Sequence, residues 1–113
     1  MKVLLFCFLF ALCLFSACKL DKKAYMIENN AILIDVRSEE EFAAGHIDGA
    51  INIPYDVIDE KIEEISSDKT KPLYLYCRSG RRVGLAIDTL QPMGYTNLHN
   101  LGGFEEAKKK WEQ

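Results

Sequence analysis

Short apolar runs alternate along the chain with segments whose apolar residues recur at helical spacing. The apolar runs occupy residues 31–36, 50–53, 73–76 and 96–101. The helical pattern occupies residues 24–29, 38–44, 57–65, 82–90 and 104–111. Because continuous apolar strands suit a parallel sheet that is covered on both faces, we expect an α/β domain. It should have a central, mostly parallel sheet of about five strands with helices on both faces.

The start of the chain differs from the rest. An almost unbroken apolar run extends from Val3 to Phe15, which is too short to span a bilayer comfortably and is typical of an export signal. Ser16-Ala17-Cys18 resembles a bacterial lipobox, so we expect a signal peptide over residues 1–18 and lipidation of Cys18. An uncleaved amino-terminal anchor is the alternative. Both predict an exported protein that is held at a membrane and faces the periplasm or the cell envelope.

Composition and charge limit the number of domains and the classes of partner that we expect. A polar spacer at residues 19–23 precedes a single domain at 24–113. The net charge of −3 disfavours nucleic acid as a partner. His46 and His99 are the only histidines and have no cluster of cysteine ligands, so we expect no metal. We also expect no cofactor, and a monomer.

The residues best suited to catalysis follow the apolar run at 73–76. A cysteine ends this run, and three arginines lie in the loop that leads into the next helical pattern, Cys77-Arg78-Ser79-Gly80-Arg81-Arg82-Val83. A tight turn into a helix points several backbone N–H groups into one concavity, which favours anions and makes a thiol there lose its proton more readily. Cys77 is also the only cysteine after Cys18, so the domain can form no internal disulfide. We therefore expect Cys77 to be a thiolate nucleophile.

This loop resembles the active-site loop of rhodaneses. Two further parts of the chain are similar to the family's signatures and follow in the family's order, namely Leu33–Phe42 with Gly45–Pro54, and Gly94–Tyr95 with Asn100–Phe104. The resemblance implies a rhodanese domain with thiosulfate sulfurtransferase activity. Cys77 would accept sulfur from a small anionic donor as a persulfide and pass it to a thiophilic acceptor such as cyanide or a thiol.

The resemblance also implies roles for the residues around Cys77. The loop from Arg78 to Val83 would bind the donor and the persulfide through its N–H groups and its arginines. Arg82 is expected either to take part in this binding or to point away and brace the loop. His46 is expected to shape the surroundings of the pocket.

Charged residues after the first predicted strand have a structural interpretation. Asp35 and Arg37 lie at the carboxyl end of that strand, and Ser38 and Glu41 have the spacing of a capping box. We interpret Asp35, Arg37 and Glu41 as a charge network that supports the site.

The sequence also predicts how two glycines and one tryptophan pack. Gly80 and Gly84 are expected where backbones approach closely, the first in the loop and the second where helix meets strand. Family members usually carry a tryptophan where this chain has Ala107. Trp111 is expected to fill a comparable site one helical turn later.

Other functions on this fold remain open alternatives. Related phosphatases and arsenate reductases have a loop that is one residue longer, and Val83 stands where their arginine would be. A persulfide carrier or thiol-redox protein would use the same Cys77. A non-catalytic binding module is the third alternative, although such modules commonly lose the cysteine.

Overall fold

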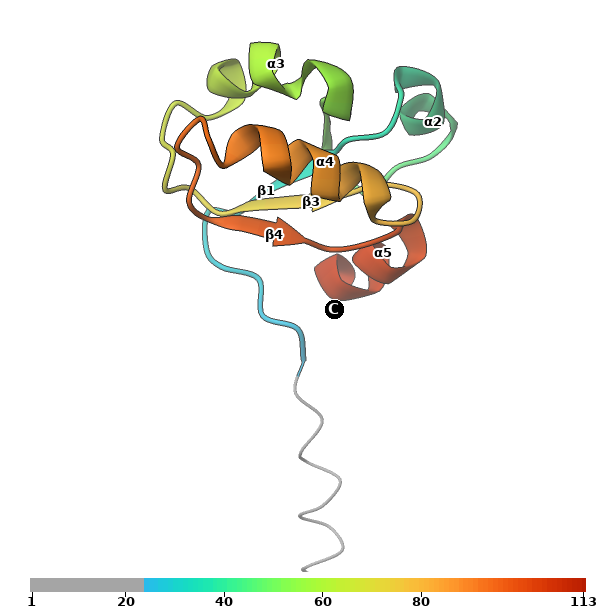
Figure 1. The fold of residues 1–113 in the computed structure, drawn as a ribbon. Helices are drawn as coiled ribbons and strands as arrows, with labels where there is room; N and C mark the ends of the chain where they lie inside the picture. The colour runs from blue at the N-terminus through green and yellow to red at the C-terminus, as the bar shows by residue number, and fades with distance from the viewer. Residues whose placement is uncertain (1–23) are drawn as a thin grey trace, which may run out of the picture.

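Four parallel strands form the sheet in the computed structural model, which describes residues 24–113 (Figure 1). The sheet order is β2-β1-β3-β4, with bounds β1 Ile32–Asp35, β2 Ile51–Asn52, β3 Leu73–Tyr76 and β4 Leu98–Asn100. Asp35 is paired with Tyr76 across the two central strands, so the residues that follow β1 and β3 leave the sheet at the same edge. The expected parallel α/β architecture is confirmed, with four strands in the described part of the chain instead of about five.

Helices cover both faces of this sheet, as expected. Their bounds are α2 Glu39–Ala44, the 3-10 turn η1 Tyr55–Val57, α3 Ile58–Ile65, α4 Arg81–Leu90 and α5 Phe104–Glu112. Figure 1 shows α3 and α4 on one face and α5 on the other. No helix within residues 24–113 is long and apolar enough to cross a membrane. The predicted export signal and Cys18 lie outside the described residues.

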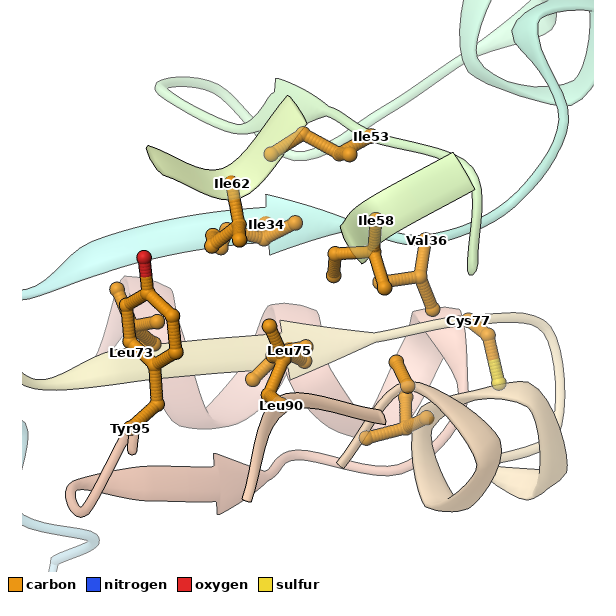
Figure 2. Close-up of a cluster of buried hydrophobic side chains, with 12 residues drawn as sticks. Ile34, Val36, Ile53, Ile58, Ile62, Leu73, Leu75, Cys77, Leu90 and Tyr95 are labelled. Carbon is orange, nitrogen blue, oxygen red and sulfur yellow. The ribbon is translucent and has the colours of Figure 1, made fainter. Parts of the chain in front are cut away.

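Alternating residues of the central strands divide the core into two clusters. Leu73 and Leu75 pack with Ile62 and Leu90 on the α3 and α4 side, as Figure 2 shows. Tyr74 and Tyr76 point the other way, into a cluster on the α5 side. Cys77 belongs to the first cluster, so the candidate nucleophile is fixed by the same packing that holds the sheet to α4.

Helix α5 packs on the second cluster through three residues at intervals of about one turn, Phe104, Ala107 and Trp111. Ala107 is fully buried, and the partly buried Trp111 ring lies 6.1 Å from the ring of Tyr74. Trp111 therefore contacts the same core cluster as Ala107.

The predicted helix at Ala24–Asn29 is wrong, because this segment has no helical hydrogen bonding. Tyr25 and Ile27 pack against the second core cluster, whereas Met26 between them is 82% exposed. This alternation has the period of extended backbone. A helix of one and a half turns is costly to nucleate, so burial of two side chains decides the conformation.

The expectation of close packing at Gly84 is also wrong. Apart from its chain neighbours and the backbone of its own helix, a Cβ atom built on Gly84 would meet no atom within 4 Å, although this residue lies inside α4. By contrast, Gly80 has a φ of +97°, a region that L residues rarely adopt.

Replacing Gly84 with alanine should therefore stabilise the fold. A glycine inside a helix costs about 0.5–1 kcal/mol relative to alanine, and nothing inside this domain requires the glycine. We expect the free energy of unfolding in urea to rise by that amount for Gly84→Ala. Gly80→Ala is the matched comparison and should destabilise the fold, since its backbone conformation is strained for alanine. A loss of stability in Gly84→Ala would reveal a packing constraint at this position.

Candidate active site

Cys77 follows directly on central strand β3 and is held there from both sides. Its N–H donates to the carbonyl oxygen of Gly102 over 3.1 Å, and its Sγ accepts from the N–H of Gly80 over 2.8 Å. The residue is fully buried and is the free cysteine of the described chain. In Figure 2 the sulfur points away from the core side chains and towards the loop that leads into α4.

The loop after Cys77 curls directly into the first turn of α4. Gly80 is the N-cap residue, and Gly84 donates the first helical hydrogen bond, to the carbonyl oxygen of Gly80 over 3.3 Å. The N–H groups of the three residues between them, Arg81 to Val83, belong to the first helical turn and have no acceptor within the helix. These donors and the helix dipole concentrate partial positive charge beside the thiol.

The Gly102-Gly103 turn before α5 packs directly against this loop. A Cβ atom on Gly103 would lie 2.5 Å from the carbonyl oxygen of Arg78, so only glycine fits there. The Asn100 side chain accepts from the N–H of Gly102 over 2.8 Å. The sequence predicted a turn at these glycines, but turn chemistry alone does not reveal which loop the turn supports.

The three loop arginines do not behave alike. Both terminal nitrogens of Arg82 donate to the two carboxylate oxygens of Glu41, over 2.7 and 3.0 Å. Arg82 thus braces the loop against α2, which is the second of its two expected roles. Arg78 and Arg81 are exposed, and neither takes part in an ion pair within residues 24–113. These two cations are therefore available to attract an anion.

The Arg82–Glu41 pair shifts the pKa values of both of its members. Hydrogen bonds from Arg82, and then from Ser38, lower the pKa of Glu41 to about 2. The hydrogen bond to Glu41, together with the charge of that carboxylate, raises the pKa of Arg82. Because the pKa of the Glu41 carboxylate is lowered in the folded state, its contribution to stability is complete above about pH 4.3 and is lost as pH falls towards 2.

Asp35 and Arg37 form a second pair, which is buried at the end of β1. Asp35 accepts from the backbone N–H of Arg37 over 2.9 Å and from its Nη2 over 2.7 Å. Arg37 also donates to the carbonyl oxygen of Gly45 over 2.7 Å, and its guanidinium lies 4.9 Å from the ring centre of Phe104. This pair ties β1 to the end of α2.

Asn52 completes the support at the end of β1 and was not identified from the sequence. Its side-chain nitrogen donates to the carbonyl oxygens of Asp35 and Arg37, both over 3.0 Å. A polar residue at the end of a short strand was the available indication of this role. The charge network predicted from the sequence therefore consists of two ion pairs, Asp35–Arg37 and Glu41–Arg82. The Asn52 amide lies beside the first pair.

The remaining predicted site residues lie in different surroundings. His46 lies just after α2, is exposed and stacks on Phe42 of that helix, with ring centres 3.7 Å apart. Ser79 is exposed and forms an isolated bridge with Gly103. The Val83 side chain is fully buried in the core, which leaves its backbone N–H as the group that faces the loop.

A parallel α/β sheet with a buried cysteine in the turn between a central strand and the N-terminus of a helix, at the carboxyl edge of the sheet, defines a class of α/β domains. Within that class the chain belongs to the Rhodanese-like domain family, whose family model matches residues 20–110. Within residues 24–113, no three side chains of His, Cys, Asp or Glu are grouped so that they could hold a metal ion.

Individual relatives agree with this membership. The chain is 41% identical to thiosulfate sulfurtransferase PspE of Escherichia coli over 73 residues, which cover 65% of this chain and 70% of PspE. It is 49% identical over 82 residues to the uncharacterized protein YqhL of Bacillus subtilis, covering 72% of this chain and 60% of YqhL. A rhodanese structure from E. coli, solved with anions, has a TM-score of 0.65 at 39% identity and covers 67% of this chain and 89% of its own.

Proposed function

We propose that this protein is a sulfurtransferase that carries sulfur as a persulfide on Cys77. The observation that carries the proposal is the position of the Cys77 sulfur, which accepts the Gly80 N–H over 2.8 Å at the start of α4. Family membership and the similarity to PspE, a thiosulfate sulfurtransferase, support it.

The proposed reaction has two balanced steps. The Cys77 thiolate attacks the outer sulfur of thiosulfate, the sulfur–sulfur bond of the donor breaks, and sulfite leaves with the bonding electron pair. The outer sulfur of the resulting persulfide is then attacked by cyanide or a thiolate, and Cys77 leaves as a thiolate. N–H groups of the loop would stabilise the charge that develops in both steps.

Phosphatase chemistry is a less suitable candidate for this site. The arginine of a longer phosphate loop would stand at position 83, where the valine side chain is buried in the core. The loop also contains no acidic residue that could protonate a leaving alcohol. These features favour transfer of sulfur over transfer of phosphate.

Steady-state thiocyanate formation tests the proposed activity. Residues 19–113 should convert thiosulfate and cyanide to thiocyanate with saturation in thiosulfate. Absence of thiocyanate, together with hydrolysis of an aryl phosphate at Cys77, would favour the phosphatase alternative.

The two exposed arginines should govern the affinity for the donor. We expect Arg78→Ala and Arg81→Ala each to raise the KM for thiosulfate by about fivefold, since an exposed charge pair contributes up to ~1 kcal/mol. The rate of sulfur transfer to cyanide from the loaded protein should hardly change. Lys108→Ala removes one positive charge from α5, on the face of the sheet opposite α4, and should leave the KM for thiosulfate unchanged. Equal effects of all three variants would indicate a general charge effect instead of binding in the loop.

We further propose that the domain is tethered to a membrane through lipid on Cys18. The lipobox-like Ser16-Ala17-Cys18 after an apolar run supports this proposal. Cys18→Ala should move the full chain from the membrane fraction of bacterial cells to the soluble fraction. A Cys18→Ala protein that remains in the membrane fraction would favour the uncleaved anchor.

A further inference from the structure

A surface groove begins at the last arginine of the Cys77 loop and crosses η1. A hollow of about 360 Å³ includes Arg82 and Lys61 in its lining, and a second hollow of about 400 Å³ includes Leu85 and Asp88. The two hollows share Tyr55 and Asp56. Arg82 and Leu85 are three residues apart on α4 and therefore lie on the same face of the helix. We call the two hollows together the η1 groove.

The η1 groove combines apolar contact surface with unpaired negative charge. Leu85 is 40% exposed, and the partly buried Tyr55 joins the two hollows. The acidic residues that line the groove are exposed and take part in no ion pair within residues 24–113, namely Glu39, Glu40, Asp56, Asp59 and Asp88.

Only two cations oppose this charge in the groove, and Glu41 already engages one of them, Arg82. The groove therefore repels a dianionic donor and complements a basic ligand.

Gly84 leaves the backbone of α4 uncovered beside Leu85. It lies one helical turn before Asp88, and a Cβ atom at this position would meet only open space. A glycine inside a helix lowers stability, and the packing of this domain gives no reason for it. A bare backbone next to Leu85 does, however, allow another polypeptide backbone to come close.

We propose that the η1 groove docks a basic segment of an acceptor protein that presents a cysteine to the Cys77 persulfide. The proposal rests on the proposed sulfurtransferase function and assigns its acceptor to a class, a protein thiol flanked by lysine or arginine. The acceptor thiolate attacks the outer sulfur, the bond between that sulfur and Cys77 breaks, and Cys77 departs as a thiolate. The acceptor keeps the sulfur as its own persulfide, so no external oxidant or reductant is consumed.

Two matched peptides test this docking. The full chain, purified in detergent and loaded with thiosulfate, is mixed with a short peptide whose cysteine is flanked by lysines, or with the same peptide carrying glutamates. The rate of sulfur removal by each peptide is divided by the rate at which the same peptide reduces a small aromatic disulfide. This ratio corrects for the different reactivity of the two peptide thiols. We expect the lysine peptide to remove the Cys77 sulfur about tenfold faster at low salt, with the advantage shrinking in 0.5 M salt.

Variants of the groove separate docking from chemistry. Asp88→Asn and Gly84→Leu should each slow transfer to the lysine peptide by about threefold or more and leave transfer to cyanide unchanged. Glu112→Gln on α5 makes the same charge change as Asp88→Asn on the opposite face and should have no effect. Equal corrected rates for the two peptides, or equal slowing of peptide and cyanide transfer by the groove variants, would overturn the proposal.

A binding measurement keeps the docking proposal separate from the proposed function. A fluorescent lysine peptide with serine in place of cysteine should bind the full chain, and Asp88→Asn should weaken this binding. If thiosulfate does not load Cys77 but this binding is seen, the sulfurtransferase function fails while docking at the groove stands. Absence of peptide binding to a chain that loads normally would refute docking alone.

Discussion

Replacing Cys77 with serine should reduce thiocyanate formation at least about a thousandfold, because the reaction passes through a covalent bond to this sulfur. Serine is slightly smaller, and its hydroxyl can still accept the Gly80 N–H that the sulfur accepts over 2.8 Å. The urea midpoint of Cys77→Ser should therefore remain close to that of the unchanged chain. Steady-state assays and urea unfolding of the same preparation provide both results.

The controls for this variant follow from the position of the thiol. Cys77 is fully buried and packs in the core cluster on the α4 side, so a disruptive change here could abolish activity by unfolding. Cys77→Ala retains the small volume but leaves the Gly80 N–H without its partner, and it should also be inactive. Activity that survives in both folded variants would remove Cys77 from the mechanism.

Asp35→Ala should lower the free energy of unfolding by about 3–5 kcal/mol, since it leaves the buried guanidinium of Arg37 without its counter-charge. Asp35 has no exposed surface and Arg37 is 7% exposed, so water cannot easily replace the lost partner. Urea unfolding followed by circular dichroism measures this loss.

The double variant Asp35→Ala/Arg37→Met tests the cause. Removing both charges should restore a large part of the stability, because the penalty arises from the unpaired cation and not from the missing carboxylate alone. A loss below about 1 kcal/mol in the single variant would mean that the pair behaves like one on the surface.

The sequence predicted those features that depend on local pattern. Apolar runs placed the four observed strands within two residues of their bounds, and the Ser38–Glu41 spacing predicted the capping box that begins α2. The position of Cys77 between a buried strand and a helix likewise follows from the order of apolar and polar residues. Parallel pairing then brings the ends of β1 and β3 to one edge without further information.

Features that depend on contacts between distant segments could not be predicted in this way. The direction of Arg82 is set by Glu41, which lies 41 residues earlier in the chain. Gly103 is required by the carbonyl oxygen of Arg78, and Gly84, expected to be tightly packed, faces open space. The segment with Tyr25 and Ile27 is extended because both side chains pack against the second core cluster, which outweighs their weak preference for a helix.

The most direct test of the sulfur cycle is the intact mass of residues 19–113 before thiosulfate, after thiosulfate and after cyanide. The proposed persulfide predicts a gain of about 32 Da, located at Cys77 by peptide mapping and removed by cyanide as thiocyanate. No gain in mass from a folded protein whose Cys77 is alkylated in the unfolded state would contradict the proposed function.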